Sequence, residues 1–166
     1  MSEFVNEMDK EPLPSGINVL TILTFVGSGF GILGGIWNYI KSADNLAKME
    51  ETMSKPEFQN APDFVKKMYS PEMIDLLRKT DANKLPLTVI AIVSCLLCVY
   101  GAIEMRKLKK SGFYTYTIGE LLPIAGSLLF LGGAYLSSGW SAYLGIGVSL
   151  LFVVLYGLQL KYLTEK

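Results

Sequence analysis

Glu120 and Pro123 lie inside an otherwise apolar stretch, TYTIGELLPIAGSLLF, at residues 115–130. An ionised carboxylate is costly within hydrocarbon, so such a residue is protonated, hydrogen-bonded or turned toward water. Pro123 has no N–H, and in a helix it leaves the carbonyl oxygen of Gly119 without its usual donor. The two residues therefore predict a polar site inside a membrane helix, where Glu120 either holds neighbouring helices together or binds a proton or cation.

Two cysteines, Cys95 and Cys98, form the run CLLC within another apolar stretch. A C-x-x-C pair in a four-helix membrane protein resembles the quinone-linked disulfide-forming enzymes and the vitamin K epoxide reductases, and this resemblance implies a membrane thiol oxidoreductase. Those families use a second cysteine pair to pass electrons onward, and this chain has two cysteines in all. An apolar setting also blunts thiol reactivity. We therefore interpret both cysteines as small packing residues and keep thiol redox chemistry as a third hypothesis.

Composition excludes several other kinds of chemistry. Histidine is absent, which removes the commonest metal ligand, the usual proton shuttle and the usual axial ligand of haem. Lys+Arg and Asp+Glu each total 15, so no basic excess indicates nucleic acid as a partner. The glycines of GSGFGILGG follow no predicted strand and do not indicate a nucleotide site. We therefore expect no catalytic residues, no metal site and no cofactor.

Four stretches are apolar and long enough to cross the roughly 30 Å hydrocarbon core as helices of about 20 residues. Hydrophobic residues make up 51% of the chain, more than a soluble domain of this size usually carries. The four stretches are residues 17–40, 85–103, 113–136 and 140–162. We predict an all-α fold, an integral membrane four-helix (tetraspan) antiparallel bundle in which short connections join the last three helices.

The segment 41–84, between the first and second stretches, is predicted to be a polar extramembrane loop. It holds eight basic and eight acidic residues. Ser70 as an N-cap, followed directly by a proline, predicts a short amphipathic helix within it. Leu46, Met49 and Met53 share one helical face and predict an extension of the first membrane helix.

Basic residues crowd the turn between the second and third stretches, and the positive-inside rule places this turn in the cytoplasm. They are Arg106, Lys107, Lys109 and Lys110. Both termini, including an N-terminal tail of residues 1–16, are then cytoplasmic and residues 41–84 lie outside. The eight basic residues of segment 41–84 are evidence against this orientation, because the positive-inside rule favours the cytoplasm for them. The acidic residues of the same segment balance their charge. The overall plan is similar to that of small tetraspan membrane proteins of bacteria, which implies the bacterial cytoplasmic (inner) membrane.

Counting along each predicted helix from the same membrane face gives the residues at the depth of Glu120. They are Thr21, Thr24, Cys95, Cys98 and Tyr156. Tyr114 and Tyr116 are expected as interfacial aromatics where the third helix enters the membrane. The sequence thus predicts that Glu120 has hydroxyl and thiol partners and need not face lipid.

Small residues spaced along a membrane helix let a neighbouring backbone approach closely. Such positions occur in all four predicted helices: Gly27, Gly31, Gly35, Ser94, Cys98, Ala102, Gly126, Gly132, Gly133, Ser141, Gly145, Ser149 and Gly157. We expect them to pack the bundle. The same positions equally suit self-association as a homo-oligomer or docking on a larger membrane-protein complex.

The leading functional hypothesis from the sequence is a non-enzymatic accessory, scaffold or assembly component of a membrane, with the polar loop as its contact surface. The alternative is a small transporter or channel subunit with a proton or cation site at Glu120. The scarcity of intramembrane charge and the lack of an inverted repeat stand against transport. The expected partners are the lipid bilayer and other membrane-protein chains, and not nucleic acid.

Overall fold

The computed structural model describes residues 13–137 and 140–164, without the side chains of Lys67, Met68, Ser137 and Ser141. Most of the predicted N-terminal tail lies outside these ranges. Over the described residues the fold is all-α and has no strand. Four helical segments are long and apolar enough to cross a membrane. They are α2 (Ser15–Ser54), α6 (Lys84–Arg106), α7 (Lys110–Leu131) and the segment Ala142–Tyr162, which contains most of α9 (Trp140–Gly157).

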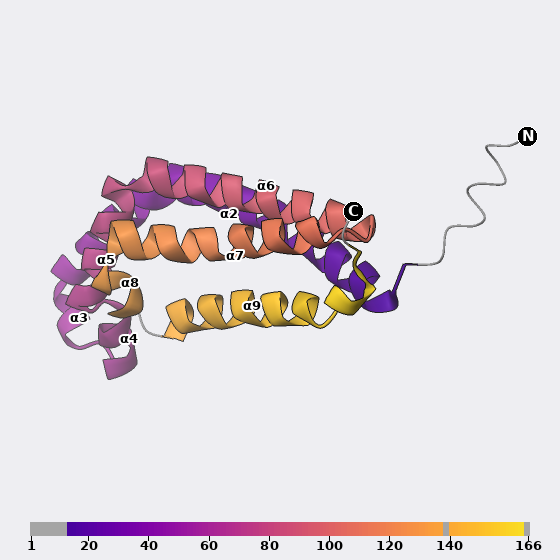
Figure 1. Ribbon diagram of the computed structural model, residues 1–166. Coiled ribbons are helices and arrows are strands. Elements are labelled where there is room, and N and C mark those ends of the chain that lie inside the picture. Colours follow the sequence, from indigo (N-terminus) through magenta and orange to yellow (C-terminus); the bar gives the residue numbers. More distant parts are fainter. Residues whose placement is uncertain (1–12, 138–139, 165–166) are drawn as a thin grey trace, which may run out of the picture.

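The long helices lie alongside one another (Figure 1). α2 and α7 run in one direction, and α6 and α9 run back. We call the end that holds Ser15, the α6–α7 turn and Thr164 the terminal end. The opposite end, the cap end, holds α8 (Gly133–Ser137) and the short helices between α2 and α6 (Figure 1). The short helices between α2 and α6 are α3 (Pro56–Gln59), α4 (Asp63–Met68) and α5 (Pro71–Ala82).

Helix α2 is longer than a membrane is thick. Its 40 residues span about 60 Å at about 1.5 Å per residue, roughly twice the hydrocarbon core. Between Gly35 and Pro56 the sequence has neither glycine nor proline, so nothing in the backbone chemistry ends the helix there. α2 therefore continues past the predicted end of the first stretch at residue 40 and forms one side of the cap.

Helix α5 holds the cap against α2. The Oγ of Ser70 accepts a hydrogen bond from the backbone N–H of Met73 at 3.4 Å, which caps the first turn of α5. Ser42 on α2 donates to Asp81 on α5 at 2.7 Å, and Arg78 on α5 reaches Glu50 on α2 at 2.6 Å. These contacts fix the cap end with polar groups on both helices.

Helices α6 and α7 form the tightest pair. A Cβ on Gly101 would lie 2.7 Å from the carbonyl oxygen of Gly112, and a Cβ on Gly112 would lie 2.6 Å from that of Gly101. The backbones therefore touch at this crossing, which only glycine permits. The turn between the helices contains Leu108 with φ +59°, a left-handed conformation that non-glycine residues adopt rarely.

The third predicted stretch, residues 113–136, is not one continuous helix. Gly132 has φ +59° and ends α7 at Leu131, and a short helix α8 (Gly133–Ser137) follows. Glycine adopts this backbone conformation at low cost. The expectation that Gly132 and Gly133 serve helix packing is wrong for the described chain, because no neighbouring atom lies within 4 Å of a Cβ at either position.

Helix α9 is the most exposed of the long helices. Ala142 and Tyr156 are its only buried residues among the side chains that the structure describes. After α9 the chain forms a 3-10 turn at Leu160–Tyr162 and then pairs with the α6–α7 turn. The backbone N–H of Thr164 donates to the carbonyl oxygen of Leu108 at 2.7 Å, and that of Lys110 donates to the carbonyl oxygen of Thr164 at 3.1 Å.

Candidate functional site

The backbone oxygen that Pro123 leaves without a helical donor is occupied. The Oγ of Ser94, on α6, donates to the carbonyl oxygen of Gly119 at 2.7 Å. Gly119 is buried, and a Cβ there would lie 2.8 Å from the Sγ of Cys98. The close approach of α6 thus replaces the hydrogen bond that the proline removes from α7.

The carboxyl group of Glu120 is hydrogen-bonded at one oxygen. The hydroxyl of Tyr116, one turn earlier on α7, donates to Oε1 at 2.7 Å. The thiol of Cys98 on α6 is 3.9 Å from the same oxygen, a long contact that suits a weak sulfur donor. Both donors are neutral, and they connect Glu120 to its own helix and to α6.

Tyrosine rings extend this cluster to the other two long helices. The rings of Tyr116 and Tyr156, the latter on α9, have centroids 4.4 Å apart. The hydroxyl of Tyr156 is 2.9 Å from Oγ1 of Thr24 on α2. We name the five residues Thr24, Cys98, Tyr116, Glu120 and Tyr156 the Glu120 layer. Each long helix contributes at least one member, so the layer joins all four.

Tyr116 is not an interfacial aromatic. Its side chain is 1% exposed, whereas that of Tyr114 is 62% exposed. The expectation placed Tyr116 near the membrane surface because aromatic residues gather there. The signal that points to its actual position is the four-residue spacing from Glu120, which puts both side chains on one face of α7.

Thr21 belongs to a different cluster from Glu120. Its Oγ1 accepts a hydrogen bond from Nη1 of Arg106 at 3.0 Å, and the same nitrogen donates to Oδ1 of Asn18 at 3.0 Å. Arg106 is the last residue of α6 and folds inward at the terminal end. Thr21 therefore bonds Arg106 and not Glu120, and its predicted depth match with Glu120 stays a prediction.

A further acid, which sequence reasoning did not single out, lies at the terminal end. Glu104 is buried and accepts a hydrogen bond from Ser111 at 3.0 Å. Lys107 and Lys109 lie 3.9 Å and 3.6 Å from its Oε1. Unlike Glu120, this carboxylate has positively charged neighbours. The residues on each side of the α6–α7 turn thus neutralise one another locally.

A cavity of about 270 Å³ opens beside Glu120, and we call it the Glu120 cavity. Its lining comes from all four long helices and includes Cys95, Cys98, Ser94, Thr24, Ser28, Gly27, Leu23, Tyr116, Val148 and Phe152. Both cysteines are free thiols. Within residues 13–137 and 140–164 no group of three histidine, cysteine or acidic side chains is placed to hold a metal ion.

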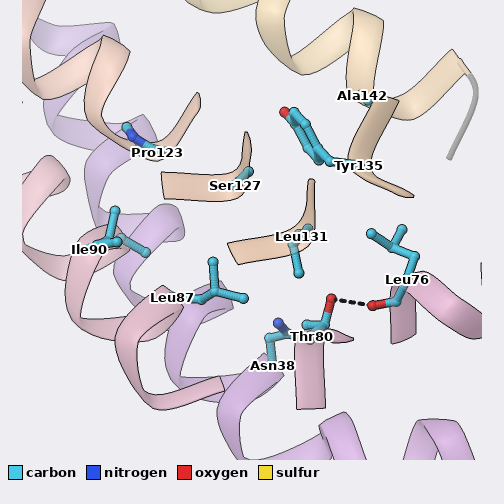
Figure 2. Close-up of a pocket in the computed structure, with 11 residues that line it drawn as sticks. Asn38, Leu76, Thr80, Leu87, Ile90, Pro123, Ser127, Leu131, Tyr135 and Ala142 are labelled. Carbon is cyan, nitrogen blue, oxygen red and sulfur yellow. Dashed lines mark hydrogen bonds between the residues drawn. The ribbon is translucent and has the colours of Figure 1, made fainter. Parts of the chain in front are cut away.

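Pro123 lines a separate cavity at the cap end, of about 350 Å³ (Figure 2). The figure shows Pro123, Leu87 and Ile90 at its wall, with Tyr135 opposite. Thr80 contributes from the cap, and its hydroxyl donates to the carbonyl oxygen of Leu76 at 2.8 Å. Among the described residues, no charged side chain lines this cavity. Glu120 and Pro123, expected in one polar site, therefore face two different cavities.

The predicted packing positions differ from helix to helix in how closely a neighbouring helix approaches them. A Cβ on Gly31 would meet the Sγ of Cys95 at 2.9 Å, and one on Gly35 would meet Ala91 at 3.7 Å. Ser94 and Ala102 are buried on α6. Gly31 and Gly35 of α2 therefore face α6, whereas Ser94 of α6 bonds α7.

The expected intramolecular contacts at Gly27 and Gly145 are wrong. No neighbouring atom of the described chain lies within 4 Å of a Cβ at either glycine. Ser149 is half-buried, and the side chain of Ser141 is outside the described residues. A Cβ on Gly157 would be 3.9 Å from the ring of Phe113, an ordinary contact. Gly145 and Gly157 of α9 therefore have no close backbone contact with the described residues.

The close seam on α7 is a glycine stripe of which the sequence reasoning found one member. Gly112, Gly119 and Gly126 recur every seven residues and all face α6. A Cβ on Gly126 would lie 2.8 Å from Cδ1 of Ile90. The seven-residue spacing, two helical turns, is a signal that a search at four-residue spacing overlooks.

Comparisons of this chain with protein-family models, with curated proteins and with solved structures give no match.

Proposed function

We propose that this chain is a tetraspan integral membrane protein whose four long helices form an antiparallel bundle. Support comes from four helical segments of sufficient length and apolar character. In our proposal the terminal end faces the cytoplasm of a bacterial inner membrane and the cap is the extramembrane loop. The four basic residues at positions 106 to 110 favour this orientation.

Cysteine accessibility tests the orientation. With Cys95 and Cys98 replaced by alanine, a single cysteine at Ser54 is expected to react with a membrane-impermeant maleimide in whole cells. A single cysteine at Ser111 is expected to react only after lysis. The reverse pattern would invert the proposed topology.

We further propose that the protein acts as a non-enzymatic accessory or assembly component. The observation that carries this proposal is that the polar groups inside the third span have partners within the chain. Ser94 bonds the carbonyl oxygen of Gly119, and Tyr116 bonds Glu120. Buried side-chain nitrogen and oxygen atoms among the described residues all have hydrogen-bond partners. Such pairing suits groups that hold helices together more than groups that await a substrate.

In this role the cap is the contact surface for another membrane-protein chain. Phe64, on the cap helix α4, is a large apolar residue with 67% exposure, so its side chain is accessible to a partner that contacts the cap. The photoreactive amino acid p-benzoylphenylalanine at position 64 is expected to give an adduct of defined mass in living cells.

Tyr162 provides the matched control, since it is an aromatic residue with 45% exposure at the terminal end. The same photoreactive residue at position 162 is expected to give no protein adduct. An adduct that contains two copies of this chain would identify a homo-oligomer. Adducts from position 162 alone, or from neither position, would contradict the cap as the contact surface.

A proton or cation site at Glu120 is the second candidate function. It is favoured by one observation, the cavity of about 270 Å³ that Glu120 lines. If the carboxyl group titrates in function, Glu120→Gln folds normally and abolishes activity, because an amide neither titrates nor carries charge. If the carboxyl group only joins helices, Glu120→Gln keeps activity and Glu120→Leu destabilises the protein.

A further inference from the structure

The Glu120 cavity has two chemically distinct walls. Helices α6 and α7 supply polar groups: the carboxyl group of Glu120, the two thiols and the hydroxyls of Ser94 and Tyr116. Helices α2 and α9 supply apolar groups from Leu23, Val148 and Phe152, beside Gly27, together with the hydroxyls of Thr24 and Ser28. A cavity with one acidic wall and one partly apolar wall matches a molecule that has both a polar and an apolar part.

The carboxyl group of Glu120 has no basic partner among the described residues. The ion pairs of residues 13–137 and 140–164 involve Glu104 at the terminal end and acids of the cap, and none involves Glu120. Both donors that reach Glu120 contact Oε1 and are neutral. A carboxylate in this position favours a positively charged partner, because burial strengthens its attraction for opposite charge.

The lining favours an organic cation over a metal ion. Calcium takes about six to eight oxygen ligands and magnesium about six in octahedral geometry, whereas this cavity offers one carboxyl group and scattered hydroxyls. No metal-ligand cluster occurs in the described part of the chain. An organic ammonium group needs one charged hydrogen bond, and its apolar body can lie against Phe152 and Leu23.

We propose that the Glu120 cavity binds a small organic ammonium ion, with Glu120 as the counter-charge and the α2–α9 wall in contact with the apolar body. The volume of about 270 Å³ lies just below the roughly 300–1,000 Å³ of typical ligand pockets. It therefore fits a single ring with a short chain and not a whole lipid. This proposal rests on the second candidate function, a cation site at Glu120, and does not depend on the accessory role.

The probe that tests the proposal is 2-phenylethylammonium, with 2-phenylethanol as its uncharged counterpart of nearly equal shape. Binding to the full chain in a non-ionic maltoside detergent is measured by ligand-observed NMR, with empty micelles as the blank. The ammonium ion is expected to bind about tenfold more tightly than the alcohol, the ratio that one charged hydrogen bond typically adds. Equal affinity of the two probes for the wild type would overturn the proposal.

Two variants locate the site. Glu120→Gln is expected to lower the affinity for the ammonium ion to that for the alcohol, while Glu104→Gln, at the buried acid of the terminal end, leaves both affinities unchanged. Gly27→Leu keeps the carboxyl group and fills the cavity, since no atom lies within 4 Å of a Cβ at Gly27. It is expected to abolish binding of the ammonium ion.

Gly29→Leu is the matched control for the cavity-filling variant. Gly29 also has no neighbouring atom within 4 Å of a Cβ, but it does not line the cavity. This variant is expected to bind the ammonium ion as the wild type does. Binding that survives Gly27→Leu would place the site elsewhere and overturn the proposal, even if Glu120→Gln fails to fold. The photocrosslinking result at position 64 is unaffected by any of these outcomes.

Discussion

The α6–α7 pair and helix α9 pack in opposite ways, although both carry small residues at regular spacing. Gly101 and Gly112 bring two backbones into direct contact, whereas a Cβ on Gly145 of α9 would meet no neighbouring atom. Glycine spacing alone does not show which helix face has a neighbour. The difference indicates that small residues stabilise this protein only where a second backbone approaches them.

The largest expected effect is the loss of the α6–α7 crossing. Gly101→Ala places a methyl group 2.7 Å from backbone atoms of α7, which cannot move as a flexible side chain can. We expect destabilisation of about 3 kcal/mol, the upper part of the range for overpacking. Gly145→Ala, the control on α9, is expected to unfold at the wild-type temperature in a mild detergent. Equal thermal stability of the two variants would remove the distinction between the seams.

Loss of the Glu120 carboxyl group should have the next largest effect. Glu120→Leu leaves the buried hydroxyl of Tyr116 without its acceptor, at a cost of about 1–3 kcal/mol. Thr24 and Tyr156 bond each other, so they keep their partner, contrary to what the depth match implied. Glu120→Gln retains an acceptor and should lose less. Thermal unfolding of both variants measures the difference, and a leucine variant as stable as the glutamine variant would show that the hydrogen bond contributes nothing.

Ser94→Ala tests the hydrogen bond that replaces the one removed by Pro123. The variant leaves the carbonyl oxygen of Gly119 without its donor and should cost about 1 kcal/mol. Ser149→Ala, at a half-buried serine of α9, is the control and should change stability less. In Pro123→Ala the helix can again supply a donor to Gly119, so Ser94→Ala should then have a smaller effect. If Ser94→Ala destabilised the Pro123→Ala variant as much as the wild type, the hydrogen bond from Ser94 would not be a replacement for the one that Pro123 removes.

The smallest expected effect concerns the polar contact between α2 and α5. This contact differs from the seams above because it consists of hydrogen bonds between side chains and not of close backbone packing. The hydrogen bond from Ser42 is the main cause that holds the pKa of Asp81 below its ordinary value, and the hydrogen bond from Lys84 lowers this pKa further. A carboxyl group with a lowered pKa stabilises the docked helix at neutral pH and loses this contribution as the pH falls through the folded-state pKa. Below about pH 4, α5 amides should exchange hydrogen faster relative to their intrinsic rates. Asp81→Asn should remove this pH dependence while leaving α6 unchanged.

Hydropathy and depth counting predicted much of the fold and part of the site. The four apolar segments follow from composition and length, and Thr24, Cys98 and Tyr156 were among the residues predicted at the depth of Glu120. Counting along an axis gives height and not rotation about the helix, so it could not separate Thr21, which bonds Arg106, from Thr24. Glu120 and Pro123 are three residues apart, which is nearly a full helical turn, so the spacing places them on a similar face of the helix. It could not show that they line different cavities.

Tyr116 and the α7 glycine stripe were missed for different reasons. An aromatic residue near the end of an apolar segment has two low-energy environments, the membrane interface and the bundle core. Only its partners, Glu120 and Tyr156, decide between them. The glycines Gly112, Gly119 and Gly126 form a stripe whose seven-residue period is visible in the sequence, but the facing helix that makes it a contact surface is a tertiary property.

Helix α2 also has a mechanical consequence. It joins the terminal end to the cap without an interruption, and no glycine or proline lies between Gly35 and the end of the helix at Ser54. A rotation of its membrane part therefore turns Ser42 and Glu50, the residues that hold α5. One uninterrupted helix thus connects Thr24 of the Glu120 layer with the polar contacts of the cap.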